Sequence, residues 1–260
     1  MPEREPEDVY RFYAERGWRR TGTGAYLDTD LFVDARPVMA AYRARSRARL
    51  KALVAGTGRY FLDAASGANP ATEYSDGYRW HVCVDFTQAA LSEARAQTGE
   101  RGLCVRADMA RLPFRAGSVQ AVYSAHTLYH LPPAAQRLAV HELARCLAPG
   151  APGVIVYTSA WLQRLGQRLR RLLGGAPATR PSLWVMPRAW LGGELRAAGL
   201  RPRVRVHQVL HSTLTRRLIP DNRLGAALLR ALAWLEGALP GTLAHVGYML
   251  LFVVRGDTDD

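Results

Sequence analysis

Two hydrophobic patterns alternate along the chain from residue 60 onward. Short runs of apolar residues, many of them β-branched, are separated by stretches in which apolar positions recur every three or four residues. The first pattern is typical of strands buried on both faces, and the second is typical of amphipathic helices. The predicted strands are 60–64, 80–86, 103–108, 119–125, 153–159, 203–209 and 246–255, and helices are predicted at about 88–98 and 134–147.

This alternation predicts an α/β fold built on a parallel sheet, with helices on both of its faces. Two helical segments come before the first strand. Residues 6–17 have apolar side chains at helical spacing and end at Gly17, and residues 36–55 are rich in Ala and Arg. No repeat or linker separates a second domain, so we expect a single domain over residues 1–260.

The stretch FLDAASGANP, at 61–70, ends an apolar run with an acid and then places small residues almost without interruption. In open parallel sheets the ligand lies beyond the carboxyl ends of the strands. Small residues at that edge let a ligand approach the backbone, and we expect the amides at the start of the next helix to face it. For this stretch alone, an ordinary tight turn is the alternative.

Acids end three successive predicted strands, and this series favours the ligand site over the tight turn. Asp63 ends the first strand, Asp85 the second and Asp108 the third. An acid at the end of the second strand accepts hydrogen bonds from both ribose hydroxyls of a nucleoside. An acid after the third strand accepts one from the amino group of adenine, with Met109 beside the ring. The series therefore predicts a nucleoside-containing cofactor.

The net charge of +13 comes almost entirely from arginine, because Lys51 is the only lysine. A basic protein can bind nucleic acid, an anionic membrane or an acidic substrate. The arginines are spread over the whole chain, so we expect no specific nucleic-acid partner. Cys83, Cys104 and Cys146 have neither disulfide nor zinc-ligand spacing, so we expect small buried cysteines and no metal site.

The hydropathy of the chain predicts neither a membrane span nor a secretion signal. No run approaches the ~18 unbroken apolar residues of a spanning helix. The first ten residues, MPEREPEDVY, are charged and proline-rich and have no apolar signal core. The apolar content of 48% is typical of a soluble globular protein. We therefore expect a cytoplasmic location.

These features resemble the class I S-adenosylmethionine-dependent methyltransferases, of the small-molecule, type 11-like group. The resemblance covers roughly residues 58–158 and rests on FLDAASGAN, VCVDFT, RADMARLPF and VYSAHTLYHLP, with HELARCLAPG as the helix before the fifth strand. It implies a Rossmann-like, doubly wound sheet of seven strands whose last strand is antiparallel. Ala65 and Asn69 replace two of the family's usual glycines. A nicotinamide-binding domain is the alternative, but TGTGAY at 21–26 lacks the third glycine and a preceding strand.

The resemblance also implies a set of residues that would hold S-adenosylmethionine, with S-adenosylhomocysteine as the product. These residues follow the first four strands, and each group of them would contact one part of the cofactor. They are Asp63, Ala65 and Gly67 at the methionine end, Asp85 at the ribose, Phe86, Asp108 and Met109 at the adenine, and Ser124 and Ala125 as the closing wall.

Specificity for an acceptor is expected outside the shared core of 58–158. The N-terminal segment 1–55 is predicted to be a helical lid in which Tyr13 contacts the cofactor, and packing into the core is the alternative for its aromatic residues. Two helical insertions, 160–186 and 210–243, are predicted to lie on the acceptor side. The first is a basic amphipathic helix, which either covers the domain or makes a weak contact with a membrane surface.

The stretch SAHTLYHLP places His126, Tyr129 and His130 just after the fourth strand, at the ligand-binding edge. Histidine accepts a proton near neutral pH, so His126 is the first candidate for a general base. His130 shares its face if the segment turns helically. Bracing of the loop is the alternative role. Methyl transfer depends mainly on positioning, and a base is needed only for an acceptor that must lose a proton.

The sequence therefore predicts an S-adenosylmethionine-dependent methyltransferase whose partner is a small-molecule acceptor, as in the tailoring of specialised metabolites. The methylated atom is oxygen, nitrogen or carbon. The NPPY-type motif of enzymes that methylate amino groups on bases or glutamine is absent. Other functions stay open on this fold: cyclisation without methyl transfer, a cofactor-binding module, or an RNA or lipid-linked acceptor.

Overall fold

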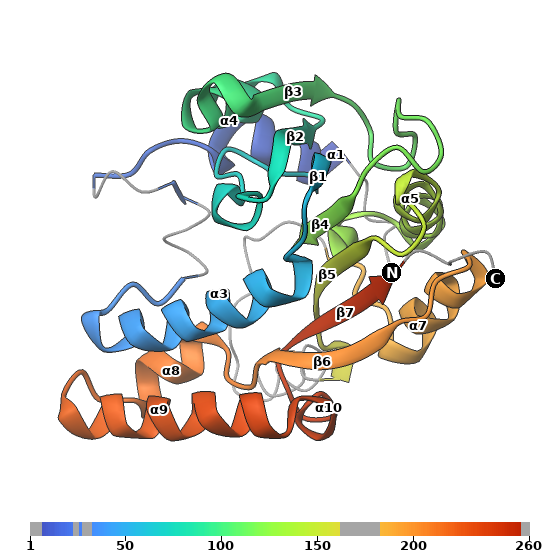
Figure 1. Ribbon diagram of the computed structural model, residues 1–260. Coiled ribbons are helices and arrows are strands. Elements are labelled where there is room, and N and C mark those ends of the chain that lie inside the picture. Colours follow the sequence, from blue (N-terminus) through green and yellow to red (C-terminus); the bar gives the residue numbers. More distant parts are fainter. Residues whose placement is uncertain (1–6, 23–25, 28–32, 162–182, 256–260) are drawn as a thin grey trace.

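A seven-stranded sheet with the order β3-β2-β1-β4-β5-β7-β6 forms the centre of the molecule (Figure 1). The computed structural model describes residues 7–22, 26–27, 33–161 and 183–255. Every predicted strand is present, with ends that differ by a few residues. The strands are β1 (Gly58–Ala64), β2 (Tyr78–Asp85), β3 (Gly102–Arg106), β4 (Ala121–Ala125), β5 (Pro152–Thr158), β6 (Arg203–Gln208) and β7 (Met249–Arg255).

The direction of the strands confirms the predicted fold class. β1 pairs with β2 and β4 in parallel, and β2–β3 and β4–β5 are also parallel. β7 runs antiparallel to both β5 and β6. Successive residues of β1 enter different core clusters, Phe61 on one face of the sheet and Leu62 on the other. The sheet is therefore buried on both faces, as the continuous apolar runs indicate.

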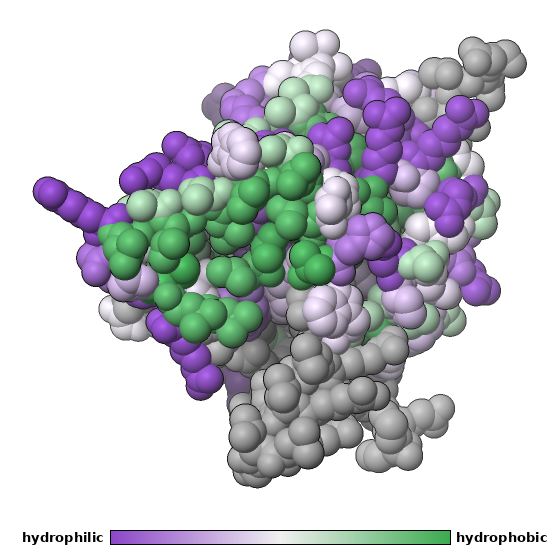
Figure 2. All heavy atoms as spheres, turned by 90° about the horizontal axis from the view of Figure 1, so that it is seen from below, coloured by the Kyte–Doolittle hydropathy of each residue, from purple (hydrophilic) through white to green (hydrophobic). Residues whose placement is uncertain are grey.

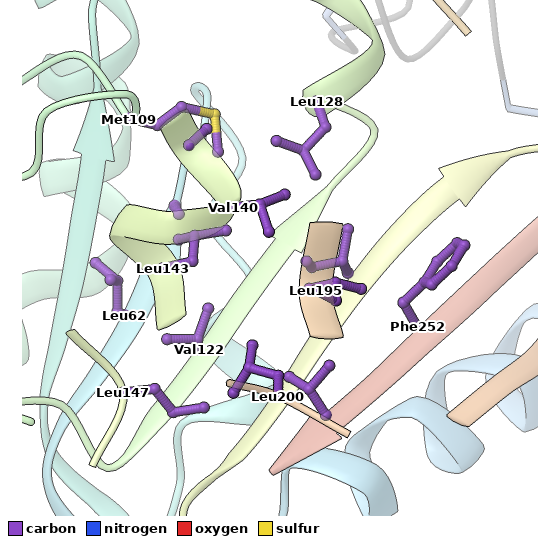
Figure 3. Packing of buried hydrophobic residues seen from close by; sticks show 14 of the residues in the cluster. Leu62, Met109, Val122, Leu128, Val140, Leu143, Leu147, Leu195, Leu200 and Phe252 are labelled. Carbon is purple, nitrogen blue, oxygen red and sulfur yellow. The ribbon is translucent and has the colours of Figure 1, made fainter. Parts of the chain in front are cut away.

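Helices cover both faces of the sheet. The helices are α1 (Glu7–Phe12), α3 (Ala40–Val54), α4 (Gln88–Thr98), α5 (Pro133–Cys146), α7 (Arg188–Ala197), α8 (Ser212–Leu218), α9 (Arg223–Ala238) and α10 (Pro240–Leu243). On one face, Leu143 of α5 and Leu195 of α7 pack against strand residues such as Leu62, Val122 and Phe252 (Figure 3). α3 and α4 cover the other face.

The helix expected directly after β1 is not formed. Residues 65–77 connect β1 to β2 and contain only a one-turn 3₁₀ helix, Thr72–Tyr74. Pro70 at one end and the turn at Gly77 at the other leave too few residues for a longer helix. α3 precedes β1 and takes over the cover of this face, where Leu50 and Val54 lie in one cluster with β1 and β4 residues. The amides at the sheet edge therefore belong to a turn.

α8 and α9 form a further layer on the outer side of α3. Met39 and Tyr42 pack there against Ile219 and Leu229. The predicted insertion 210–243 thus contains α8, α9 and α10, whereas most of the predicted insertion 160–186 lies outside the described residues. No helix in the described ranges has the length and hydropathy needed to cross a bilayer. Among the cysteines, which are free thiols, Cys104 is only partly buried.

A buried carboxylate, Asp34, fastens the chain to α8 just before α3 begins. Its oxygens accept hydrogen bonds from Arg36 (Nη2–Oδ2, 2.8 Å) and from the hydroxyl of Thr215 (2.8 Å). Arg36 also donates to the carbonyl oxygens of Thr215 and Ile219, both at 2.8 Å. Burial alone would raise the pKa of Asp34, but the hydrogen bonds from Arg36 and Thr215 outweigh it and hold the pKa at about 2.

Asp34→Asn should lower the free energy of unfolding by about 2 kcal/mol at neutral pH. Because the folded-state pKa lies below the ordinary value, this contribution is present above that value and is lost as the pH falls through about 2. Urea unfolding at neutral and acidic pH measures the effect. Asp76→Asn is the control: its ion pair with Lys51 is exposed, so the cost should be below about 1 kcal/mol. Equal losses in the two variants would contradict the prediction.

Candidate functional site

The loop after β1 brings backbone close to the carboxyl edge of the sheet. Ala65 and Gly67 have positive φ angles of 57° and 61°. The N–H of Ser66 donates to the carbonyl of Val84 in β2 (3.0 Å), which anchors the loop between the two strands. A Cβ on Gly67 would lie 2.4 Å from Cη2 of Trp18. Glycine is required here because the Trp18 ring lies directly against the backbone.

Asp85, at the end of β2, holds this loop in place. Its carboxylate is buried and accepts hydrogen bonds from the N–H of Gly67 (3.1 Å) and from the N–H and hydroxyl of Thr87 (both 2.9 Å). Burial raises the pKa of Asp85, and the hydrogen bonds from Thr87 and Gly67 oppose that shift. These hydrogen bonds hold the carboxylate between Gly67 of the loop and Thr87 at the start of α4.

Asp63, at the end of β1, is paired with a histidine that the sequence analysis missed. Its Oδ2 contacts Nε2 of His81 (3.1 Å) and accepts from the N–H of Ala71 (2.8 Å). The other ring nitrogen of His81 contacts the hydroxyl of Ser75 (2.9 Å). Asp63 and His81 are both buried. Asp63 therefore fixes the β1–β2 connection, and the signal for its partner was a histidine inside the apolar run WHVCVDF.

The residues predicted to surround an adenine lie beyond the ends of β2 and β3. The carbonyl of Asp85 accepts from the N–H of Ala107 (3.1 Å), so the two strand ends are adjacent. Asp108 is exposed, and its Oδ1 accepts from the N–H of Ala110 (2.9 Å). Met109 is buried in the main core cluster, and Phe86 is half-buried. An exposed carboxylate and a half-buried ring thus share this corner.

The N-terminal segment places a row of aromatic rings against this edge. Tyr13 contacts Trp18 (ring centroids 5.3 Å apart) on one side and His130 (5.7 Å) on the other. Trp18 in turn contacts Tyr26 (6.0 Å), whose hydroxyl donates to Glu93 of α4 (2.7 Å). Within the predicted lid 1–55, these aromatic residues lie next to the loop after β1 that contains Gly67. α3, which belongs to the same predicted lid, covers one face of the sheet instead.

Three buried polar atoms near this edge have no hydrogen-bond partner among the described residues. They are Nε1 of Trp18, Oγ of Ser124 and Nδ1 of His130. Trp18 lies on Gly67, Ser124 is next to the end of β4, and His130 is connected to Trp18 through the Tyr13 ring. Buried polar groups are almost always hydrogen-bonded in native proteins. Their position at one edge makes it the candidate site for a polar ligand.

His126 and His130 follow β4 and have unprotonated side chains at neutral pH. His126 has a φ of 61°, and its N–H donates to the carbonyl of Val156 (3.1 Å). Its ring is accessible to water, yet the protein around it lowers its pKa to about 4. Burial and the charge of His126 lower the pKa of His130 to about 4 as well. Ala125, next to them, is half-buried.

The other candidate in this stretch, Tyr129, lies in the core. It is buried in the main hydrophobic cluster, and its ring contacts Tyr157 with centroids 5.5 Å apart. Its carbonyl accepts from the N–H of Trp184 (2.7 Å). His130 is half-buried beside it and reaches Tyr13 instead. The 3₁₀ turn Leu128–His130 thus points one ring inward and the next toward the N-terminal segment.

A third histidine, His207 of β6, lies close enough to His126 to be affected by its charge. Burial, followed by the charges of His126 and Arg49, lowers the pKa of His207 to about 3. Nδ1 of His207 lies 3.4 Å from the hydroxyl of Ser46 in α3. The alternating run RVRVHQV predicted the strand but gave no indication that His207 lies near the site.

A buried carboxylate, Glu236 of α9, connects the outer layer to this side of the site. It accepts from the hydroxyl of Tyr42 (2.6 Å), from Arg49 (2.6 Å) and from the N–H of Val209 (2.9 Å). Arg49 also donates to the carbonyl of His207 (3.3 Å). Both oxygens of this buried carboxylate accept hydrogen bonds, one of them from the charged Arg49. α3 and α9 are thereby fixed beside His207.

Residues 62–155 match the family model described as Methyltransferase domain. These residues form a methyltransferase domain. The match agrees with the resemblance to methyltransferases that the sequence motifs indicated. The matched range contains every predicted cofactor-binding residue apart from Tyr13, together with the two histidines after β4.

A curated relative is similar to part of this chain. It is an uncharacterized chloroplastic methyltransferase of Arabidopsis thaliana, 30% identical over 160 residues. The aligned part spans 57% of this chain and 40% of the relative, so the match covers less than half of that protein's length.

Two solved structures have the same fold as this chain. Geranyl diphosphate methyltransferase, in complex with GPP and sinefungin, has a TM-score of 0.58 at 16% identity, over 96% of this chain and 98% of its own. The cyclase SpnF has a TM-score of 0.55 at 16% identity, over 97% of this chain and 91% of its own. At these identities the likeness concerns the fold.

Proposed function

We propose that this chain transfers a methyl group from S-adenosylmethionine to a small molecule. The observation that carries the proposal is the set of three partnerless buried polar atoms, on Trp18, Ser124 and His130, at the carboxyl edge of the sheet. Leaving such an atom unpaired costs about 1–3 kcal/mol. The cofactor's carboxylate and ammonium offer an acceptor and donors at its methionine end, so its binding removes this cost.

The remaining edge residues suit the nucleoside end of the cofactor. Asp85, at the end of β2, takes a ribose hydroxyl, and the exposed carboxylate of Asp108 takes the adenine amino group. Phe86 and Met109 supply apolar surface to the ring. Asp63 acts as a positioning residue, because its contacts with His81 and Ala71 hold the loop.

Catalysis in this proposal depends mainly on orientation. The bound cofactor supplies a methyl group that its sulfonium charge already activates. The chain positions the acceptor and excludes water with the segment that carries Tyr13 and Trp18. For an acceptor that must lose a proton, His126 or His130 accepts it, because both imidazoles are neutral at pH 7. Their low pKa values make them weak bases, which suits an acceptor that is itself easily deprotonated.

A small acceptor is supported by what surrounds the histidines. His207 lies close enough to His126 to be affected by its charge, and Ser46 and Arg49 of α3 contact His207. Geranyl diphosphate methyltransferase, which has a similar fold, was solved with the small molecule GPP. We therefore propose that the acceptor is a specialised metabolite, which is methylated on oxygen, nitrogen or carbon. Nucleic acid is disfavoured, because the arginines form no single tract.

The likeness to SpnF supports a second candidate function, cyclisation without methyl transfer. The two functions differ in their products. A methyltransferase converts the cofactor to S-adenosylhomocysteine in proportion to the methylated acceptor, whereas a cyclase leaves the cofactor unchanged and its product keeps the mass of the substrate. Mass spectrometry of both product and cofactor therefore separates them.

The central experiment measures cofactor binding and turnover in the purified chain. Calorimetry should show micromolar binding of S-adenosylmethionine and no binding of NAD. Incubation with methyl-labelled cofactor and a panel of small phenols, amines and carboxylic acids should yield S-adenosylhomocysteine and a labelled product. Absence of S-adenosylmethionine binding would contradict the proposal, since the edge residues would then hold a different ligand.

Trp18→Phe should weaken the binding of S-adenosylmethionine by about 3- to 10-fold, which corresponds to the loss of one hydrogen bond. The variant keeps an aromatic ring on Gly67 and removes the unpartnered Nε1 donor. Trp80→Phe is the control, because Trp80 lies near the start of β2, at the opposite edge. Equal affinities in both variants would show that the indole nitrogen does not contact the cofactor.

A further inference from the structure

A continuous apolar surface lies on the side of the molecule formed by α8 and α9. Seen from that side, a green area extends across the face (Figure 2). Trp234 is 68% exposed, Leu218 63% and Leu224 62%. We call this surface the α8–α9 face; its exposed large side chains are Leu214, Leu218, Leu224, Leu228, Trp234, Leu235 and Leu239. Soluble proteins seldom expose so many large apolar side chains together without a partner.

The geometry of α9 explains why the surface is flat and apolar. The inner side, with Leu229 and Ala233 among others, packs toward α3. At 100° per residue, the side chains between these positions point outward. They are Leu, Trp and the small residues Ala227, Ala231 and Ala238, all exposed. Over its 16 residues α9 therefore presents an apolar stripe about 24 Å long.

Arginines border this stripe on one side. Arg223 and Arg230 are seven residues apart, so they point in nearly the same direction, and Trp234 follows one turn later. Arg217 of α8 is exposed as well. The acids of the α8–α9 segment offset them only in part: Glu236 is buried against Arg49, which leaves Asp221 as the exposed acid. The face is therefore apolar with a positive margin.

We propose that the α8–α9 face binds the surface of an anionic lipid bilayer. The arginine margin complements acidic headgroups, while Leu and Trp side chains enter the boundary between headgroups and acyl chains. Trp234 beside Arg230 is the arrangement typical of such interfaces. α9 lies in the plane of the surface. This contact goes beyond the proposed methyl transfer and does not depend on it.

A second copy of the chain fits this face less well. A two-fold dimer places the same patch on both sides of the interface. Burying the apolar stripe of α9 against itself brings the margins of Arg223 and Arg230 from both copies near each other, and Asp221 is the one exposed acid between Ser212 and Ala238 to offset them. Like charges brought together oppose association.

Sedimentation with vesicles tests the proposal on the chain of residues 1–260. The probes are phosphatidylcholine vesicles and vesicles of equal parts phosphatidylcholine and phosphatidylglycerol. The chain should bind the anionic vesicles, with binding that falls as salt rises, and should leave the neutral vesicles unbound. The double variant Leu224→Ser, Trp234→Ser should lower the partition coefficient about tenfold, because it removes apolar side chains from the contact.

Control variants test whether vesicle binding depends on the α8–α9 face or only on the overall hydrophobicity and charge of the chain. Leu138→Ser changes another exposed leucine (56%) on α5 and should leave binding unchanged. Arg223→Gln with Arg230→Gln should lower binding to anionic vesicles by about tenfold, whereas Arg111→Gln with Arg115→Gln, exposed residues before β4, should have a much smaller effect. Circular dichroism confirms that each variant is folded.

Two results would overturn the proposal. One is vesicle binding that does not depend on the face, either because the face variants bind as well as their controls or because the parent chain does not bind vesicles at all. The other is a dimer in analytical ultracentrifugation that dissociates on Leu224→Ser with Trp234→Ser, which would assign the face to a second copy.

Discussion

Replacing Asp85 by alanine should weaken S-adenosylmethionine binding by about 10- to 150-fold. The expected loss is about 1.5–3 kcal/mol, the worth of hydrogen bonds to a charged group. The change removes the proposed acceptor for the ribose and also frees the N–H of Gly67, so the bond from Ser66 to Val84 is left to link the loop to β2. Calorimetry at neutral pH measures the affinity, and thermal unfolding measures how much stability is lost with it.

A milder variant separates the two roles of Asp85. Thr87→Val removes the hydroxyl that donates to Asp85 (2.9 Å) but keeps the carboxylate and its bond from Gly67. It should cost less than about tenfold in affinity. If Asp85→Ala binds the cofactor as tightly as the parent chain, Asp85 only holds the loop and does not contact the ribose.

The second large effect is expected from the histidines after β4. If one of them is the general base, its replacement by alanine should lower the rate of methyl transfer by about 10²-fold or more, with cofactor affinity nearly intact. His126 has the accessible ring and is the first candidate, and His130 is half-buried beside Tyr13. His141→Ala, at an exposed site on α5, serves as the control.

The pH dependence of the rate provides an independent test. Because the pKa of each histidine is lowered to about 4, the basic form is present throughout the neutral range and is lost as the pH falls toward about 4. The rate in the parent chain should therefore stay constant through neutral pH and fall only in acid. If both alanine variants keep their rate, the chain acts through positioning alone.

The strands and the strand-end acids could be predicted because both depend on local sequence. Continuous apolar runs locate β1 to β5, and the resemblance supplied the antiparallel direction of β7. Asp63 and Asp85 lie at the ends of β1 and β2, and Asp108 comes shortly after β3. The loop with Ala65 and Gly67 has the positive φ angles that small residues favour. Each of these features depends on the sequence of only a few neighbouring residues.

The features that were missed depend on contacts between distant parts of the chain. The connection 65–77 is too short for the expected helix, and α3 covers the face in its place. α7 was not predicted because Gly192 and Gly193 weaken its helical signal. The pairings of Asp63 with His81 and of Trp18 with Gly67, and the approach of His207 to His126, join residues whose proximity no local pattern reveals.

The cover supplied by α3 decides where an independently folding fragment of this chain begins. Leu50 and Val54 bury Phe61, Tyr123 and Val154 on the face that the short β1–β2 connection leaves uncovered. A fragment limited to the matched range 62–155 would expose this apolar surface and aggregate. A fragment that starts just before Asp34 keeps both α3 and the carboxylate that fastens it to α8. We therefore expect the smallest fragment that folds independently to be larger than the matched family region and to include the whole of α3 before the first strand.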